Sequence, residues 1–196
     1  MINNRLIYNH VFEFIILLFG LVYAGLFIPF NWWIIPIVSM LLFLFEQRSI
    51  IKSNLKRALV IGFFLLVFDF AFENTGTLIF RSWGTGGSSL FILAVPLEVM
   101  ITCFFGGAWW AQHFMSVHGQ FASRFQGHFN GRLRFYLIVL DLFFFGIGGA
   151  TAEWFLVQRG VMYYANGWNS IHAFIAYFTT WFILHTLLYA LSKRAK

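Results

Sequence analysis

Apolar runs recur along nearly the whole chain, and most of them are long enough to cross the hydrocarbon core of a membrane. About 20 apolar residues span that core as a helix. Charged residues make up only 10% of the 196 residues, whereas a soluble domain carries about a quarter. The sequence therefore predicts an all-α integral membrane protein, with one transmembrane domain over residues 1–196. Its predicted helices cover residues 11–29, 32–45, 58–80, 89–112, 135–156 and 171–191.

Lys and Arg fall very unevenly between the two sides of the six predicted helices. Arg81 and Arg159 are on one side, and the other eleven basic residues are on the side that holds both chain ends. Such an excess marks the cytoplasmic side. We therefore expect three hairpins with both termini cytoplasmic, in the cell membrane. The basic residues that give the net charge of +6 flank the apolar runs, where membrane topology places them. We therefore expect no nucleic-acid partner. The eleven residues are Arg5, Arg48, Lys52, Lys56, Arg57, Arg124, Arg132, Arg134, Lys193, Arg194 and Lys196.

Several acidic residues lie inside the apolar runs, where a charge is costly and usually marks a functional site. Asp69 and Glu98 are expected at a shared depth near the midplane, and Glu73 follows Asp69 by one helical turn. Clustered carboxylates in such a site cannot all ionise, so one keeps a proton and can act as a general acid. We predict Glu98, Asp69 and Glu73 as catalytic residues. The alternative is that these acids only hydrogen-bond between helices and hold the bundle together.

Asp141, Glu153 and His185 are secondary candidates. Asp141 has two possible partners, Arg134 or a neighbouring helix, while Glu153 is expected near the outer surface, where it closes a site or forms an interfacial pair. His185 is the one histidine in the interior of its predicted helix, as a hydrogen-bonded core residue commonly is. Asp141 and Gly148 have the same spacing as Asp69 and Gly76, which is a weak indication of an internal repeat.

The sequence lacks the residues that thiol, metal-dependent or lysine-based membrane chemistry would need. Cys103 is the single cysteine, the histidines form none of the short clusters that metal-dependent membrane oxygenases use, and the lysines lie at or beyond helix ends. We therefore expect no metal and no cofactor. An aromatic-rich bundle with protonatable carboxylates suits proton-initiated chemistry on a hydrocarbon, in which aromatic faces stabilise a carbocation.

Asp69, Glu73 and Gly76, followed by Val95-Pro96-Leu97-Glu98, resemble the membrane-type lycopene cyclase domain. That family includes heterodimeric and fused carotenoid cyclases and is related to carotenoid hydratases. Its pattern is an intramembrane Asp, a glycine, and a Pro-x-Glu-Glu motif that opens the next helix. The resemblance covers residues 65–112, with a fainter second half at 140–190, and implies that Glu98 is the principal acid and Asp69 its partner. Val99 replaces the second acid of the motif, and the second half lacks Pro-x-Glu.

The resemblance and the acids together lead us to expect an enzyme that cyclises or hydrates the end group of a polyene, either a lycopene cyclase-like isomerase or a hydratase-like lyase. Its expected partners are membrane lipids, a long apolar polyene or prenyl-lipid substrate, and further subunits in a homo- or hetero-oligomer. Midplane acids also occur in proton pathways, so a proton-coupled carrier or a lipid-binding transport protein is the alternative. A third alternative is a membrane subunit without catalytic activity.

Overall fold

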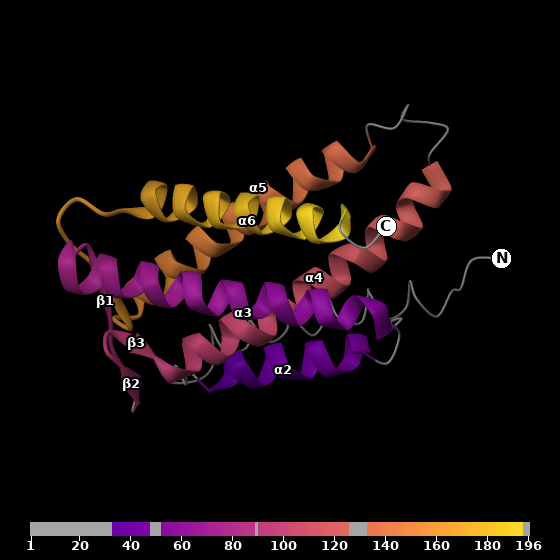
Figure 1. Ribbon diagram of the computed structural model, residues 1–196. Helices are drawn as coiled ribbons and strands as arrows, with labels where there is room; N and C mark the ends of the chain where they lie inside the picture. The colour runs from indigo at the N-terminus through magenta and orange to yellow at the C-terminus, as the bar shows by residue number, and fades with distance from the viewer. Residues whose placement is uncertain (1–32, 48–51, 89, 126–132, 194–196) are drawn as a thin grey trace.

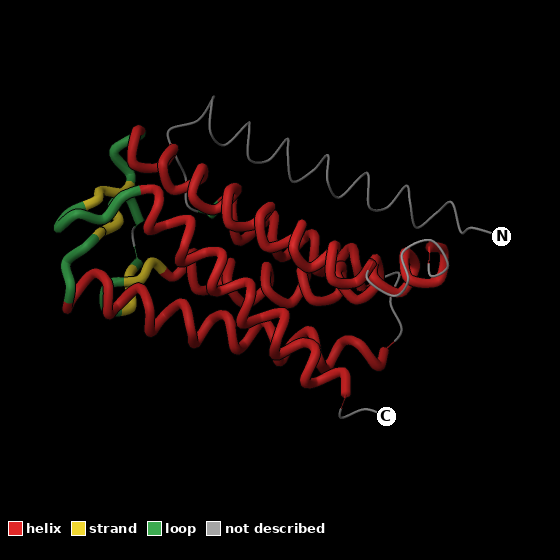
Figure 2. Tube along the Cα trace, turned by 90° about the horizontal axis from the view of Figure 1, so that it is seen from above, coloured by secondary structure: helices red, strands yellow, loops and turns green. Residues whose placement is uncertain are grey.

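The computed structural model describes residues 33–47, 52–88, 90–125 and 133–193, and their structure is mostly helical. The predicted helix at 11–29 lies outside the described residues. Figure 1 shows the long helices running alongside one another, and Figure 2 shows the short strands and loops gathered at one end of the bundle. The helices are α2 (Ile34–Gln47), α3 (Lys52–Asn74), α4 (Leu97–Phe125), α5 (Leu133–Gln158) and α6 (Ser170–Lys193), and a π-helix at Thr75–Ile79 continues α3.

Most predicted helices are present with shifted ends, and the predicted helix at 89–112 needs the largest correction. Strands β2 (Phe91–Ile92) and β3 (Val95–Pro96) pair as a small hairpin there, and α4 begins only at Leu97. The physical reason is Pro96, which has no N–H to donate and disfavours the helical conformation for the residue before it. Glu98 consequently lies in the first turn of α4 and not in the middle of a helix.

Among the described residues, two helices are long and apolar enough to cross a membrane, over Phe135–Gln158 and Ser170–Ser192. These segments belong to α5 and α6, the fifth and sixth predicted spans. Apolar side chains cover much of their outer faces; Leu140, Ile147 and Ile171 are among the most exposed. Helix α2 is apolar as well but shorter.

Small residues let the helices approach one another closely. A β-carbon on Gly62 of α3 would overlap the backbone oxygen of Phe104 in α4, and Gly107 of α4 packs against Leu65. Between α5 and α6, a β-carbon on Gly149 would lie 2.5 Å from the ring of Tyr177. Close approach of this kind is characteristic of helix packing in membranes.

A second strand pair joins the loop after α3 to the loop after α5. Strands β1 (Trp83–Thr85) and β4 (Met162–Tyr164) run antiparallel, with Trp83 opposite Tyr164 and Thr85 opposite Met162. Figure 1 shows β1 at the end of the bundle where α3 ends. This pairing fixes the end of α3 relative to the end of α5, and that is where the acidic side chains lie.

Candidate functional site

Three carboxyl groups from two helices form the main polar site, which we call the acidic cluster: Asp69 and Glu73 of α3 and Glu153 of α5. Glu73 interacts electrostatically with both Asp69 and Glu153, and Glu153 also interacts with Asp69. Asp69 and Glu73 are one turn apart on a single helix face, as their spacing predicts. Glu153 joins them because the β1–β4 pair holds the end of α5 beside the end of α3.

Neutral groups donate hydrogen bonds to the cluster. The indole nitrogen of Trp83 donates to Glu73 Oε2 at 2.7 Å, and the hydroxyl of Tyr164 donates to Glu153 Oε2 at 2.8 Å. The side chain of Tyr177 also bonds to Glu153, and the Cys103 thiol bonds to Asp69. Asp69 Oδ2, by contrast, is buried and has no hydrogen-bond partner among the residues that the structure describes. Asp69 therefore has an oxygen free to exchange a proton with a bound molecule.

The β1–β4 pair connects two of these donors directly. Trp83 and Tyr164 are opposite each other, and opposed residues of an antiparallel pair project from the same face. Each donates to one glutamate of the cluster, Trp83 to Glu73 and Tyr164 to Glu153. Trp83 is only 5% exposed, so packing as well as the strand pair holds its indole ring beside Glu73.

A row of aromatic rings leads along α3 to the cluster. Phe64, Phe68 and Phe72 are spaced four apart, with ring centroids 5.9 and 6.3 Å apart. Phe72 stacks on Trp83 at 5.3 Å, and Trp83 lies 4.3 Å from Trp168. The row therefore ends at the ring whose N–H bonds to Glu73. Aromatic faces close to an acid can stabilise a developing cation.

Among the described contacts, Glu98 is hydrogen-bonded outside the acidic cluster. It is 1% exposed and accepts a hydrogen bond from the Ser88 hydroxyl at 2.8 Å. Helices α3 and α4 run antiparallel, with Ala94 bonded to Asn74 and Cys103 bonded to Asp69. Glu98, in the first turn of α4, lies between these two contacts along the helices. The structure thus brings Asp69 and Glu73 together as predicted, adds Glu153, and places Glu98 against the loop before α4.

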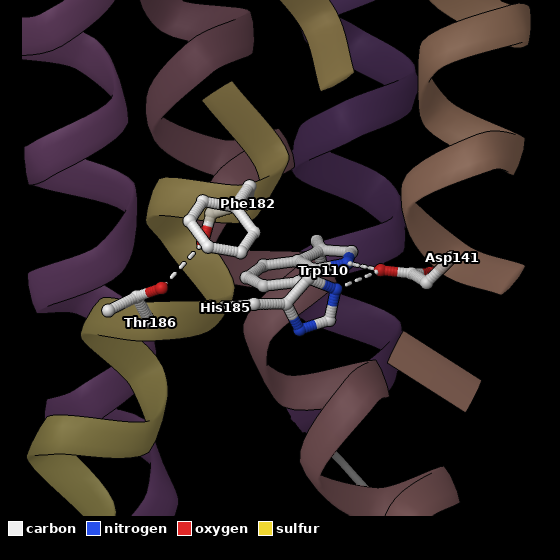
Figure 3. A network of polar contacts seen from close by, with 5 residues as sticks. All are labelled: Trp110, Asp141, Phe182, His185 and Thr186. Carbon is white, nitrogen blue, oxygen red and sulfur yellow. Dashed lines mark hydrogen bonds and ion pairs between the residues drawn. The ribbon is translucent and has the colours of Figure 1, made fainter. Parts of the chain in front are cut away.

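Asp141 and His185 form a second polar site farther along the bundle. Figure 3 shows Asp141 Oδ2 in contact with two groups: the indole nitrogen of Trp110 donates to it at 3.0 Å, and His185 Nε2 lies 2.7 Å away. The rings of Trp110 and Phe114 pack edge-on against the His185 ring. Of the two predicted alternatives for Asp141, the structure shows contact with neighbouring helices, through Trp110 of α4 and His185 of α6.

Among the residues that the structure describes, no group of three or more His, Cys, Asp or Glu side chains is arranged to hold a metal ion. No protein-family model, no curated protein and no solved structure matches the chain. Inferences about function therefore come from the geometry of the site.

Tyr164 is expected to make the stability of the protein depend on pH in the alkaline range. Burial, and next the charge of Glu153, raise the pKa of Tyr164 above its ordinary value. The neutral phenol, which donates to Glu153, is thus favoured in the folded state, and its contribution to stability is present below about pH 10 and declines as the pH rises further. We expect stability to fall above about pH 10, and to fall less in Tyr164→Phe. Thermal unfolding at a series of alkaline pH values measures this, with Tyr163→Phe on the exposed neighbour as control; equal pH dependence in all three proteins would contradict it.

Proposed function

We propose that the protein is a membrane enzyme that protonates the end group of an isoprenoid or carotenoid and so starts its cyclisation or hydration, with the acidic cluster as the site of proton transfer. One observation carries the proposal: three carboxyl groups converge with neutral hydrogen-bond donors, and one buried carboxyl oxygen, Asp69 Oδ2, has no partner within the described part of the chain. Acids held in apolar surroundings without basic partners are the groups that can deliver a proton to a weakly basic substrate.

The three acids have different surroundings, and these suggest different roles. Glu73 and Glu153 accept hydrogen bonds from Trp83 and Tyr164, which suits a proton acceptor. Asp69 has the free oxygen, which suits the donor. In this scheme the Asp69 proton forms a C–H bond with the π electrons of a terminal alkene and leaves a carbocation.

The carbocation is then consumed in one of two ways. In cyclisation, a second double bond attacks it and Glu73 removes a proton from the new ring, so substrate and product are isomers. In hydration, a water molecule attacks and Glu73 takes the proton that the water loses. In both cases a proton returns from Glu73 to Asp69, its neighbour one turn away. The aromatic row that ends at Trp83 supports the cation.

We further propose that the chain forms six spans with both termini in the cytoplasm. The two candidate spans, with the apolar side chains on their outer faces, support a membrane location. The resemblance of residues 65–112 to the membrane-type lycopene cyclases supports a polyene or prenyl-lipid substrate.

Expression in cells that make lycopene, followed by pigment chromatography, tests the proposal. We expect a cyclised or hydrated product that Asp69→Asn abolishes, because an amide cannot deliver the proton. Thr180→Ala is the control, since that hydroxyl bonds only the backbone of its own helix at Ala176 among the contacts described. Unchanged pigment with several polyene precursors would argue against the enzyme. A product that survives Asp69→Asn but is lost with Glu98→Gln would move the proton donor to α4.

A further inference from the structure

Helices α5 and α6 meet along one face that repeats every fourth residue. At one end Asp141 contacts His185, and one turn farther Phe145 stacks on Trp181, with ring centroids 4.0 Å apart. The next turn places Gly149 against the Tyr177 ring, and Glu153, which bonds to Tyr177, follows on α5. The same face thus carries a protonatable group at each end and aromatic side chains between them.

Those aromatic side chains interrupt the polar contacts. Tyr177 and His185 are eight residues apart on α6, about 12 Å along a helix. A proton moves directly only between groups within hydrogen-bond distance, roughly 3 Å. Phe145 and Trp181 fill this interval, and Trp110 of α4 packs edge-on against Trp181 at 4.8 Å. The Asp141–His185 pair is therefore separated from the acidic cluster by an aromatic layer.

We propose that Asp141 and His185 form a second proton-binding site, that this site exchanges protons with the end of the bundle opposite the β1–β4 pair, and that Phe145 and Trp181 prevent transfer to the acidic cluster. His185 is 6% exposed and the Asp141 side chain 21%, so the pair is largely shielded yet reachable at the carboxyl group. From α4, the Trp110 N–H and the Phe114 ring face the pair. Among the described contacts, Asp141 of α5 and His185 of α6 are the titratable groups at this site. The inference concerns α5 and α6 and does not depend on the isoprenoid reaction.

Proton entry into vesicles tests the aromatic layer. Full-length protein in phosphatidylcholine vesicles with a trapped pH-sensitive dye is expected to admit protons slowly. Trp181→Leu should raise proton entry several-fold, because it removes a ring from the layer and lets water reach both sites. Adding Asp141→Asn should return the rate to that of the wild type. Trp154→Leu is the matched control, since Trp154 lies on α5 with 49% of its surface exposed.

Infrared spectra of the wild-type protein test the same inference if the Trp181 variant does not fold. In vesicles that hold the chain in one orientation, the carboxyl band lost in Asp141→Asn should follow the pH on one side only. The band lost in Asp69→Asn should follow the pH on the other side. If both bands follow the pH on the same side, the proposal is wrong. In the vesicle experiment, the proposal is also wrong if the Trp181→Leu protein folds but does not leak, or if its leak persists after Asp141 is replaced.

Discussion

Replacing Gly76 by alanine is expected to lower the free energy of unfolding by about 2–4 kcal/mol. A β-carbon at Gly76 would overlap the ring of Trp83, which is almost fully buried. The ring must then move, and the 2.7 Å hydrogen bond from Trp83 to Glu73 is lost along with the packing. The displacement should also disturb the β1–β4 pair, because Trp83 lies opposite Tyr164. We therefore expect any product that depends on the acidic cluster to fall with stability.

Gly148→Ala is the matched control for this substitution. Gly148 lies in α5, and a β-carbon there would meet no atom of the described residues within 4 Å. Alanine should leave stability unchanged or raise it by up to about 1 kcal/mol, because it favours the helix more than glycine does. Unfolding titrations in detergent compare the two variants with the wild type. Equal effects at the two positions would show that contact with Trp83 is not what requires glycine at position 76.

Replacing His185 by leucine is expected to lower the free energy of unfolding by about 2–4 kcal/mol, because the largely buried carboxyl group of Asp141 loses a hydrogen-bond partner. The substitution removes the 2.7 Å contact and leaves the carboxyl group of Asp141 with the Trp110 N–H as its described partner. Leucine keeps a comparable apolar volume beside Phe114, so loss of packing contributes little. The same unfolding titrations measure the loss.

A double-mutant cycle separates the pair from the packing of the ring. In an Asp141→Leu background, His185→Leu should cost less than about 1 kcal/mol, because no carboxyl group is left without its partner. The same cost in both backgrounds would mean that His185 acts through ring contacts with Trp110 and Phe114 alone.

The helical class follows from the apolar runs, and four predicted helices have counterparts in α2, α3, α5 and α6. The main error concerns residues 89–96, where an apolar run reads as helix but Pro96 imposes a strand pair. Hydropathy indicates that a segment is apolar, but it does not distinguish a helix from a strand. Two of the predicted spans, in α5 and α6, are long and apolar enough to cross a membrane among the described residues, and the first predicted span lies outside them.

Part of the site was predictable in the same way. Asp69 and Glu73 share a helix face because they are four residues apart, and that relation needs no tertiary structure. Glu153 is predicted near the outer surface, where it closes a site or forms an interfacial pair, but its partners Tyr164 and Asp69 come from other elements, which the period of one helix does not specify. The shared spacing of Asp69–Gly76 and Asp141–Gly148 does not extend to packing, since a β-carbon at Gly76 would meet Trp83 and one at Gly148 would meet no atom of the described residues within 4 Å.

By itself, the sequence determined the apolar helices, the scarcity of charge and the joint placement of Asp69 and Glu73, because these depend on composition and on the period of one helix. The tertiary structure alone decided which acids meet. Glu153 reaches the cluster from a helix 80 residues farther along the chain than Glu73, held there by the pairing of β1 with β4. His185 reaches Asp141 because α5 and α6 pack side by side. Contacts between distant segments depend on packing in three dimensions, and a pattern along one chain does not specify them.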